Sequence, residues 1–467
     1  MPYGSTAPGD EEALLPAEVP ATPVVAANKQ QRAVALTVLC VSAGVLGTLA
    51  YQASIDERAA PAVAEMDVSE PGSMSTMKKH SEKTGLSRYT VSGTSSLSSS
   101  TETVLTPTDS DATSETVALM EAMSSLRYDS KFLFGHQNTN YIGQYFLDKD
   151  GTSGYSDVKN GTGSYPAVFG FDFADVVENG ISFTEHVKTA YANGGIVAFD
   201  WKPCNPEKVN SACANEVYGT PCKKILGESA KPYSYFTGWL DTIIDEIKTF
   251  KSDGTKIPII FRLFHENTGG WYWWGVDSVD DVETCSDEDY KALFNFTQDY
   301  IHDAGIHNIL WEYAPAKPSD DYDSAFYDRY PGSDRIDIVA FDRYSTDDEY
   351  AEDVLSDCQT VAEWAENHNL LAAIGETGIS SGIQDETSSY KDWYYDDFGK
   401  NFMTDSTSYC TQIVYALAWE NANEHSYWVP LPNNELWDGF QKLYESDYGI
   451  FADDSDWQTT LTDAGYY

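Results

Sequence analysis

The sequence predicts an α/β fold in which eight parallel strands and the helices between them close into a (β/α)8 barrel, or TIM barrel. After residue 116, short runs of β-forming residues alternate with longer amphipathic stretches, which is typical of repeated βα units. Most of these runs are followed at once by a polar or aromatic residue, as the active-site end of a barrel requires. A doubly wound open sheet is the alternative, but no glycine-rich phosphate turn follows any of the runs.

Eight runs rich in β-branched and aromatic residues are the expected strands. They cover residues 132–135, 167–171, 196–199, 257–264, 308–311, 336–341, 371–375 and 412–418. The residues that end these runs are His136, Asp172, Asp200, Glu266, Glu312, Asp342, Glu376 and Trp419. Because the carboxyl ends of barrel strands meet at one mouth, we expect these side chains around one site. Apolar residues at helical spacing predict helices at residues 233–250 and 356–368.

The first 115 residues are expected to lie outside the barrel domain, which we place at residues 116–467. Residues 33–53 carry no charge and approach the ~20 apolar residues that a membrane-spanning helix needs. Basic residues precede this segment, so the positive-inside rule places the tail, residues 1–32, in the cytosol. We therefore expect a type II signal-anchor protein of the secretory pathway, with the barrel lumenal or extracellular, or a secreted protein if the segment is cleaved. Residues 54–115 are rich in Ser and Thr and predict a flexible stalk.

Charge and cysteine content narrow the functional classes. The formal net charge of −45 disfavours nucleic acid as a partner, because a phosphate backbone would be repelled. Six of the seven cysteines follow the apolar segment, and an even number fits up to three disulfides of open pairing in an exported domain. Their spacing does not match a zinc site, and we expect no metal and no organic cofactor. Sequons at Asn160 and Asn295 agree with the secretory route.

Residues 261–275 carry the clearest chemical signal. A run of β-forming residues ends there in a histidine, a carboxylate, two glycines and four aromatic residues. This pattern predicts a buried strand that delivers an acid into a cleft walled by flat rings. Such a cleft suits a pyranose sugar, whose C–H face stacks on the rings while its hydroxyls form hydrogen bonds. A tryptophan-rich plug in the core or at an interface is the structural alternative.

Glu266 and Glu376 end two different strands and are the candidate catalytic pair. Cleavage of a glycosidic bond needs one carboxyl group to protonate the leaving oxygen and a second one to attack or to activate water. The structural alternative for Glu376 is a buried salt bridge, for which Arg262 is the candidate partner. Tyr344 is expected to hydrogen-bond a carboxylate and to keep it ionised.

Other polar residues at the strand ends are candidates for smaller roles. The acids Asp172, Asp200, Glu312 and Asp342 are expected to orient hydroxyl groups or to anchor loops. His136 and His265 are candidate sugar contacts, with a buried structural histidine as the equal alternative for each.

Several motifs spread along the chain resemble those of one known family. Residues 262–275 read Arg-Leu-Phe-His-Glu-Asn-Thr-Gly-Gly-Trp-Tyr-Trp-Trp-Gly. Further motifs are Leu-Phe-Gly-His-Gln at 133–137, Tyr-Pro-Ala-Val-Phe-Gly-Phe-Asp at 165–172, Val-Ala-Phe-Asp-Arg-Tyr at 339–344, Gly-Glu-Thr-Gly at 375–378 and Leu-Ala-Trp-Glu-Asn at 417–421. Together they resemble glycoside hydrolase family 26, whose best-known members are endo-β-1,4-mannanases. The resemblance extends over about residues 119–451.

The resemblance implies a retaining endo-β-glycosidase that hydrolyses β-1,4-mannosidic bonds in mannan, glucomannan or galactomannan. Glu376 would be the nucleophile and Glu266 the acid/base. The supporting residues would be His265 beside the acid/base, Tyr344 beside the nucleophile, and Arg262. The substrate-binding residues would be His136, Trp201, Lys202, Trp271, Trp274 and Trp419. The partner would be a polysaccharide, and the protein is expected to be a monomer.

The chain departs from the family pattern at two places near the expected substrate. Residues 201–206 read Trp-Lys-Pro-Cys-Asn-Pro, so Lys202 stands where the family usually has a sugar-contacting histidine. Asn267 and Thr268 replace the usual Met-Asn after the acid/base. These changes leave mixed-linkage β-glucan and β-1,3-xylan open as alternative substrates. A non-catalytic cell-surface carbohydrate-binding protein and a structural cell-wall protein are the alternatives from other classes.

Overall fold

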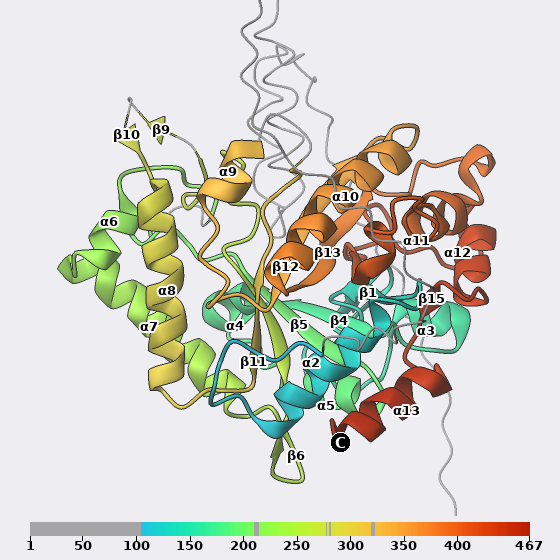
Figure 1. Cartoon of the computed structure of the whole chain (residues 1–467), viewed down its shortest axis with the longest axis horizontal. Coiled ribbons are helices and arrows are strands. Elements are labelled where there is room, and N and C mark those ends of the chain that lie inside the picture. The colour runs from blue at the N-terminus through green and yellow to red at the C-terminus, as the bar shows by residue number, and fades with distance from the viewer. Residues whose placement is uncertain (1–103, 210–213, 277, 280–281, 319–322) are drawn as a thin grey trace, which may run out of the picture. The chain divides into compact units, whose positions relative to one another are not determined.

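Eight parallel strands form a closed barrel, because the last strand pairs with the first (Figure 1). The computed structural model describes residues 104–467 apart from 210–213, 277, 280–281 and 319–322. The barrel strands are β1 (Phe132–Gln137), β4 (Val168–Asp172), β5 (Ile196–Trp201), β8 (Ile259–Leu263), β11 (Ile309–Tyr313), β12 (Ile338–Ser345), β13 (Leu371–Ile379) and β14 (Ile413–Ala418). Each overlaps one of the eight predicted runs, so the predicted barrel is confirmed. A short strand, β15 (Gly449–Ile450), also pairs with the amino end of β1.

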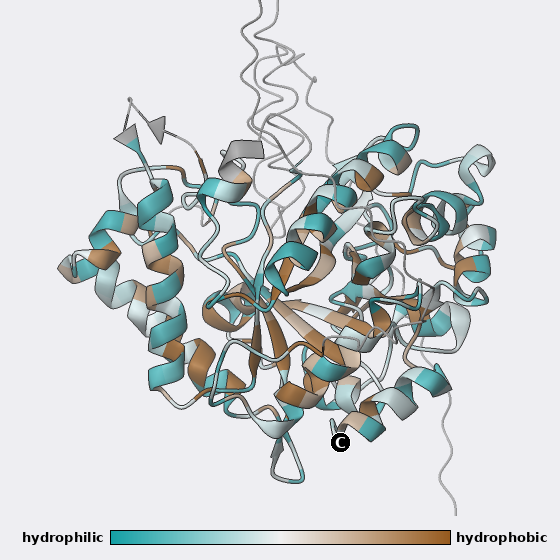
Figure 2. Ribbon diagram, viewed as in Figure 1, coloured by the Kyte–Doolittle hydropathy of each residue, from teal (hydrophilic) through white to brown (hydrophobic). Residues whose placement is uncertain are grey.

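Helices occupy the connections between the strands and surround the barrel (Figure 1). They are α2 (Ser114–Leu126), α3 (Asp157–Thr162), α4 (Phe173–Asn179), α5 (Thr184–Ala192), α6 (Pro221–Leu226), α7 (Ala230–Ile247), α8 (Asp287–Asp303), α9 (Asp323–Asp328), α10 (Tyr350–His368), α11 (Asn401–Met403), α12 (Trp437–Tyr444) and α13 (Ser455–Ala464). The two helices predicted from apolar spacing correspond to α7 and α10. On α7 the spacing buries one stripe, from Phe236 to Ile247, while the opposite face stays hydrophilic. Figure 2 shows the same division: apolar residues on the strands and polar residues on the outer faces of the helices.

Smaller elements lie in the loops. Three hairpins consist of β2 (Ile142–Gly143) with β3 (Phe146–Leu147), β6 (Lys251–Ser252) with β7 (Thr255–Lys256), and β9 (Ser278–Val279) with β10 (Val282–Glu283). Short 3-10 helices span Ser388–Tyr390 and Cys410–Gln412, and a π-helix spans Tyr394–Lys400. None of these elements joins the barrel sheet.

Two disulfides link the outer layer. Cys222 on α6 is bonded to Cys285, just before α8, and Cys358 on α10 is bonded to Cys410, just before β14. They join residues 63 and 52 positions apart, so each constrains a long stretch of the unfolded chain. Cys213 lies outside the described residues. The expectation of several disulfides among the six cysteines thus holds for the four that these two bonds join.

Residues 104–115, which we expected to belong to the stalk, lie against the barrel. The backbone N–H of Thr108 donates to Asp337 Oδ1 at 2.7 Å, and Asp109 Oδ2 lies 2.8 Å from His307 Nδ1. The expected first residue of the domain, 116, falls inside helix α2. The described fold therefore begins at least twelve positions earlier than the apolar periodicity indicated, because this segment is held mainly by polar contacts.

The expected tail, the expected membrane span at residues 33–53 and most of the expected stalk lie outside the described residues. Within the part of the chain that the structure describes, no helix combines the length and the hydrophobicity needed to cross a bilayer. The anchor stays a prediction from the sequence.

Candidate active site

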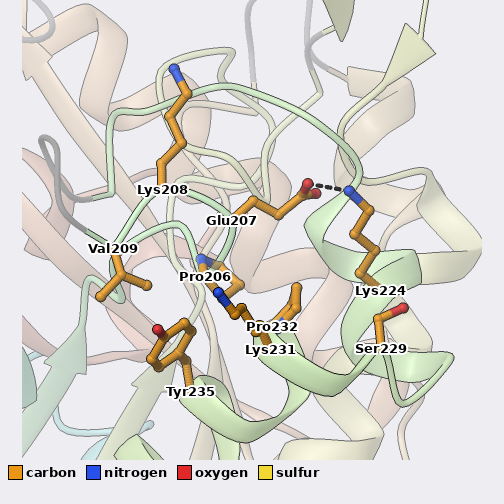
Figure 3. A pocket seen from close by; sticks show the side chains of 9 residues that line it. All are labelled: Pro206, Glu207, Lys208, Val209, Lys224, Ser229, Lys231, Pro232 and Tyr235. Atoms are coloured by element: carbon orange, nitrogen blue, oxygen red, sulfur yellow. Dashed lines mark hydrogen bonds and ion pairs between the residues drawn. The ribbon is translucent and has the colours of Figure 1, made fainter.

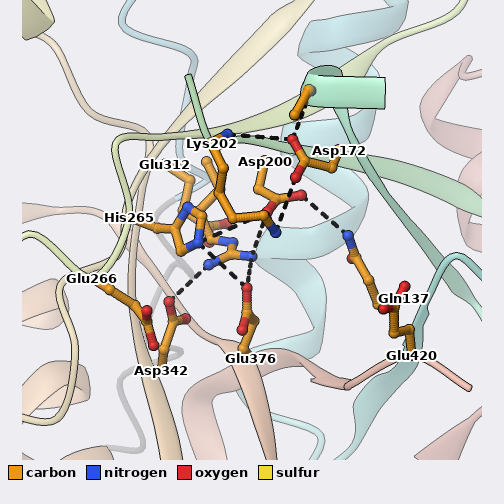
Figure 4. Close-up of polar contacts among 12 residues, drawn as sticks. Gln137, Asp172, Asp200, Lys202, His265, Glu266, Glu312, Asp342, Glu376 and Glu420 are labelled. Atoms are coloured by element: carbon orange, nitrogen blue, oxygen red, sulfur yellow. Dashed lines mark hydrogen bonds and ion pairs between the residues drawn. The ribbon is translucent and has the colours of Figure 1, made fainter. Parts of the chain in front are cut away.

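Charged side chains from neighbouring strands form one layer near the carboxyl ends of the barrel strands (Figure 4). The layer consists of Asp172, Asp200, Arg262, Glu312, Asp342 and Glu376, all buried. Neighbours in this layer are register partners in the sheet, on the strand pairs β4–β5, β5–β8, β8–β11 and β12–β13. Since every second residue of a barrel strand points inward, one level of the barrel is filled by charge instead of by the usual branched apolar residues.

Arg262 stands in the middle of this layer. Its Nη1 donates to Asp342 Oδ2 at 2.7 Å, and its Nη2 donates to Glu376 Oε1 at 2.5 Å. Carboxylate oxygens of Asp200 and Glu312 lie 3.7 and 4.0 Å from the same guanidinium. The ion pair that we considered between Arg262 and Glu376 is therefore present. One cation shared by four acids compensates charges that would each be costly to bury alone.

The side chain of Glu376, on β13, points into the barrel and accepts two hydrogen bonds. Arg262 binds one of its oxygens, and the hydroxyl of Tyr344 donates to the other, Oε2, at 3.0 Å. Burial, with the negative charge of Glu376 next, raises the pKa of Tyr344 well above its usual range, so the phenol keeps the proton that it donates. Both oxygens of Glu376 thus accept hydrogen bonds, which fixes the orientation of its side chain.

Glu266 lies just beyond β8 in a turn of unusual backbone geometry. Its φ is +53°, and that of Phe264 is +50°, so the chain leaves the strand direction here. The backbone N–H of Glu266 donates to the carbonyl of Ala314 at 2.8 Å, and the indole N–H of Trp271 donates to its Oε2 at 2.6 Å. Burial, followed by the charge of Glu376, raises the pKa of Glu266 to about 8, despite the hydrogen bond from Trp271. Glu266 therefore holds a proton at neutral pH.

The two glutamates lie close together. Carboxylate oxygens of Glu266, Asp342 and Glu376 all lie within 4.8 Å of one another. Retaining glycosidases have their two carboxyl groups about 5–5.5 Å apart, whereas inverting enzymes leave about 6.5–9.5 Å for a water molecule. The spacing in this protein is compatible with direct attack by one carboxylate.

His265 lies beside Glu376 rather than beside Glu266. Its Nε2 is 3.6 Å from Glu376 Oε1 and 3.8 Å from Asp200 Oδ2. Burial lowers its pKa well below the usual range, and the positive charges of Arg262 and Lys202 add to the effect, so the ring is neutral. The resemblance implied support for the acid/base; the ring of His265 also contacts the expected nucleophile, and its supporting role stays a prediction.

Lys202 and Trp419 form the next part of the mouth. The ammonium of Lys202 lies 3.0 Å from Asp172 Oδ2 and 2.9 Å from Asp200 Oδ2. It also lies 4.9 Å from the centre of the Trp419 ring, within the range of a cation–π contact. Burial, with the charge of Asp200 next, raises the pKa of Asp172 to about 7. Both predicted binding residues thus lie within the charged mouth, and the cation of Lys202 is held by two acids.

Trp201 and His136 are buried outside the mouth, which corrects our assignment of both to substrate binding. Neighbouring residues of a strand face opposite sides. Asp200 faces the mouth, so Trp201 faces outward, where its ring lies 5.5 Å from that of Phe236 on α7. Gln137 donates to Asp200 Oδ1 at 3.1 Å, so its neighbour His136 points away. The His136 ring is fully buried, and desolvation lowers its pKa to about 3.

Trp274 is also buried in the core. Tyr272, not Trp274, lies toward the charged residues of the mouth. The Trp274 ring stacks on Tyr272 at 4.4 Å, and its indole N–H donates to the carbonyl of His265 at 2.8 Å. Sequence reasoning did not single out Tyr272, although it lies next to Trp271 in the same aromatic turn. Burial and the negative charge of Glu266 raise its pKa well above the usual range, so its hydroxyl is a donor near Glu266 and Glu376.

The acids of the mouth face cations that the chain itself supplies. Two sets of side chains bring ligand atoms within 4.8 Å of one another, the first being Asp200, His265 and Glu376 and the second being Glu266, Asp342 and Glu376. Arg262 pairs with members of both sets, and Lys202 with one. The positions that a metal ion would need are therefore already faced by guanidinium and ammonium groups.

Comparison with known proteins agrees with this geometry. A mannan endo-1,4-beta-mannosidase of Bifidobacterium adolescentis is 28% identical over 379 residues, which is 74% of this chain but only 34% of that protein. One of Bacillus subtilis strain 168 is 26% identical over 52% of this chain and 67% of its own length. Among solved structures, a modular endo-beta-1,4-mannanase of Cellulomonas fimi has a TM-score of 0.67 at 28% identity, covering 76% of this chain and 79% of that one. A GH26 beta-mannanase of Bacteroides ovatus has a TM-score of 0.63 at 28% identity, covering 73% and 96%.

The family match covers both glutamates and the whole barrel. Residues 108–419 match the family described as Glycosyl hydrolase family 26, which is more than half of the chain and includes all eight strands of the closed barrel, while α12, β15 and α13 follow it. The similarity of the solved structures covers the same barrel. This chain belongs to glycosyl hydrolase family 26 and is a mannanase-like glycoside hydrolase.

Proposed function

We propose that this protein is a retaining endo-β-1,4-mannanase. The observation that carries the proposal is the pair Glu266 and Glu376: they have carboxylate oxygens within 4.8 Å of each other, the pKa of Glu266 is raised to about 8, and two donors hold the oxygens of Glu376. A retaining mechanism needs such a pair, one group charged for attack and the other protonated for the leaving oxygen.

In the first step, a carboxylate oxygen of Glu376 attacks the anomeric carbon. The glycosidic C–O bond breaks, and Glu266 transfers its proton to the departing oxygen, which leaves a covalent glycosyl ester on Glu376. In the second step, water attacks the anomeric carbon while Glu266, now a carboxylate, takes its proton. The ester bond to Glu376 breaks, and both carboxyl groups return to their starting states.

Arg262 and Tyr344 support this cycle by orienting Glu376. Their hydrogen bonds compensate its negative charge in the resting enzyme and remain available when the ester releases the carboxylate. Lys202, Trp271, Tyr272 and Trp419 lie around the pair and are the proposed sugar contacts. Of these, Trp271 also donates to the acid/base, so it connects substrate binding with proton transfer.

The names of the similar proteins support β-1,4-mannan as the substrate, because each one quoted above is described as a mannosidase or mannanase. The second candidate is the same chemistry on mixed-linkage β-glucan or β-1,3-xylan. It is favoured by Lys202, which places an ammonium where the family pattern has histidine. A non-catalytic carbohydrate-binding protein is the alternative from another class, and the intact carboxyl pair argues against it.

The test is a substrate panel with product analysis. The purified protein is incubated with mannan, glucomannan, mixed-linkage glucan and β-1,3-xylan, and the products are sized and their anomeric configuration is followed by NMR. We expect short β-manno-oligosaccharides that are released with retained configuration. Oligomers from glucan or xylan alone would contradict the mannanase proposal and leave the mechanism standing, whereas inverted products would contradict the mechanism.

We further propose that the protein enters the secretory pathway through residues 33–53, as a type II anchored or a secreted enzyme. The disulfides Cys222–Cys285 and Cys358–Cys410 support an oxidising compartment. Asn160 of the first sequon is exposed and accessible to glycosylation. Protease protection of microsomes carrying the protein tests the orientation, because a lumenal barrel resists digestion until detergent is added.

A further inference from the structure

A pocket of about 670 Å³ lies between the loop that follows β5 and the start of α7 (Figure 3). Pro206, Pro232 and the ring of Tyr235 form its apolar wall, while Ser229, Lys208 and Lys231 supply polar groups. Its volume falls within the range of small-ligand sites, about 300–1,000 Å³. A flat apolar wall beside hydrogen-bonding groups suits a pyranose ring.

The aromatic wall is exposed and continues along the helix. The Tyr235 side chain is 41% exposed, although it lies in a helix whose apolar stripe is otherwise buried. Trp239 follows one helical turn later, and its ring lies 6.4 Å from that of Tyr235 with only 18° between the two planes. Two nearly parallel rings on one face of a helix present a flat surface on which the C–H face of a sugar stacks.

The opposite wall is fixed before any ligand arrives. Glu207 is held by an ion pair with Lys224 on α6, and its Oε1 accepts a hydrogen bond from the backbone N–H of Thr220 at 2.8 Å. The disulfide between Cys222 on the same helix and Cys285 ties α6 to the segment before α8. A pocket with pre-formed walls loses little conformational entropy when it binds.

The pocket lies on the same end of the barrel as the catalytic carboxyl groups. The connection after β5 begins with Lys202, whose ammonium faces the mouth, and continues through Pro206 and α6 to the first turn of α7. In a (β/α)8 barrel every connection from a strand to the next helix starts at the active-site end. A polymer that extends beyond the mouth therefore runs over the end of the barrel that carries this pocket.

From this arrangement we infer that the pocket between the β5 loop and α7 is a second binding site for the polysaccharide, in which a pyranose ring stacks on Tyr235. Lys231 and Ser229 hydrogen-bond the hydroxyls of that ring. This inference rests on the proposed function, since it takes the same glycan as its ligand. The site holds a distant part of the chain that is being cleaved, which raises the local concentration of glycosidic bonds at the mouth without taking part in their cleavage.

The test compares Tyr235→Ala with Tyr128→Ala in the full-length protein. Tyr128 is 52% exposed and lies in the turn between α2 and β1, at the opposite end of the barrel, so it is a matched control for loss of an exposed tyrosine ring. Binding is measured by affinity electrophoresis in gels that contain each of the four polysaccharides, with both changes also made in a Glu376→Ala background to remove hydrolysis. Kinetics are measured on the polymer and on mannotetraose.

We expect Tyr235→Ala to weaken retention by the polymer and to raise its KM about three- to tenfold, the range that loss of one aromatic stacking contact gives. The kcat and the kinetics on mannotetraose should not change, and Tyr128→Ala should match the parent in every assay. Equal behaviour of the two variants, or an equal loss on mannotetraose, would overturn the second site while the proposed hydrolysis stands. Retention that depends on Tyr235 in a protein that cleaves no polysaccharide would overturn the proposed function and support the site.

Discussion

Glu266 and Glu376 have the same side chain but different surroundings. Glu376 extends from β13, at a point where the pairing register shifts on both sides of the strand, into a layer of charges in which Arg262 and Tyr344 donate to its two oxygens. Glu266 extends from a turn with positive φ and receives one side-chain hydrogen bond, from Trp271. The difference teaches that one residue type can be set up in two ways: two donors hold and orient Glu376, whereas burial, and next the charge of Glu376, raises the pKa of Glu266 to about 8.

The charged side chains can pack closely against β13 because residue 375 is a glycine. A Cβ atom at Gly375 would lie 2.6 Å from Asp342 Oδ1 and 2.9 Å from Arg262 Cδ. Any other residue there would push the guanidinium or Asp342 aside and so disturb the hydrogen bond to Glu376. The glycine before the expected nucleophile thus has a steric reason in the charged layer.

The largest expected effect is a loss of hydrolysis rate in variants of the two glutamates. The size of the loss should depend on the leaving group of the substrate in one variant and not in the other. Glu376→Ala removes the attacking group and should reduce the rate on every substrate by about 10⁴-fold or more. Glu266→Ala removes the proton donor and should reduce the rate on the polymer by about 10²- to 10⁴-fold, with a much smaller loss in the glycosylation step of an aryl glycoside whose phenolate leaves unprotonated. Initial and pre-steady-state rates on both substrate types measure the contrast, and equal losses for both variants on the aryl substrate would contradict the division of roles.

An intermediate effect should appear in the pH profile. With a pKa of about 8, Glu266 loses its proton as the pH rises, so kcat/KM should fall through this range. Trp271 stabilises the charged form, so Trp271→Phe should raise the pKa of Glu266 and move the falling limb to higher pH, by about one unit or less. The profile of kcat/KM against pH measures the shift, with Trp201→Phe as a control that leaves the limb in place. A limb that moves to lower pH in Trp271→Phe would contradict the assignment.

The smallest effect should distinguish the mouth from the core. Trp419→Phe replaces the indole ring that faces Lys202 by a smaller ring and weakens a cation–π contact worth about 0.5–2 kcal/mol. We therefore expect KM to rise several-fold. The melting temperature should stay near that of the parent. Trp201→Phe leaves KM unchanged and lowers stability by about 1–3 kcal/mol, since it leaves a cavity against Phe236. Thermal unfolding and KM on mannotetraose check the two halves. A change in KM for Trp201→Phe would return this residue to the binding site.

The strands and the placing of Glu266 and Glu376 at one end of the barrel were predictable from sequence because each rests on a local signal. Runs of β-branched residues locate the strands, and an acid that interrupts such a run, as Glu376 does, marks a strand end. Asp200 and Trp201 show where that reasoning stops. The sequence places both at one strand end, but only the register with Arg262 on β8 determines which of them faces the mouth.

The turn after β8 could not be predicted. Phe264 and Glu266 adopt positive φ, a conformation that the sequence signals only through glycine or asparagine. Because the turn reverses the expected alternation, His265 lies beside Glu376, and Tyr272 rather than Trp274 lies toward the acids. Tertiary contacts, such as the hydrogen bond from Glu266 to Ala314, hold the backbone in this state.

The polar contacts of residues 104–115 place this segment at the end of the barrel opposite to the mouth. Asp337 and His307, which these contacts use, directly precede β12 and β11 and so lie at the amino ends of the strands. Residue 104, where the described chain begins, is close to the turn before β13 at the same end. Residue 104 therefore lies at the foot of the barrel, and the mouth opens the other way. The approach to Glu266 and Glu376 is thus separated from residues 104–115 by the full length of the barrel strands.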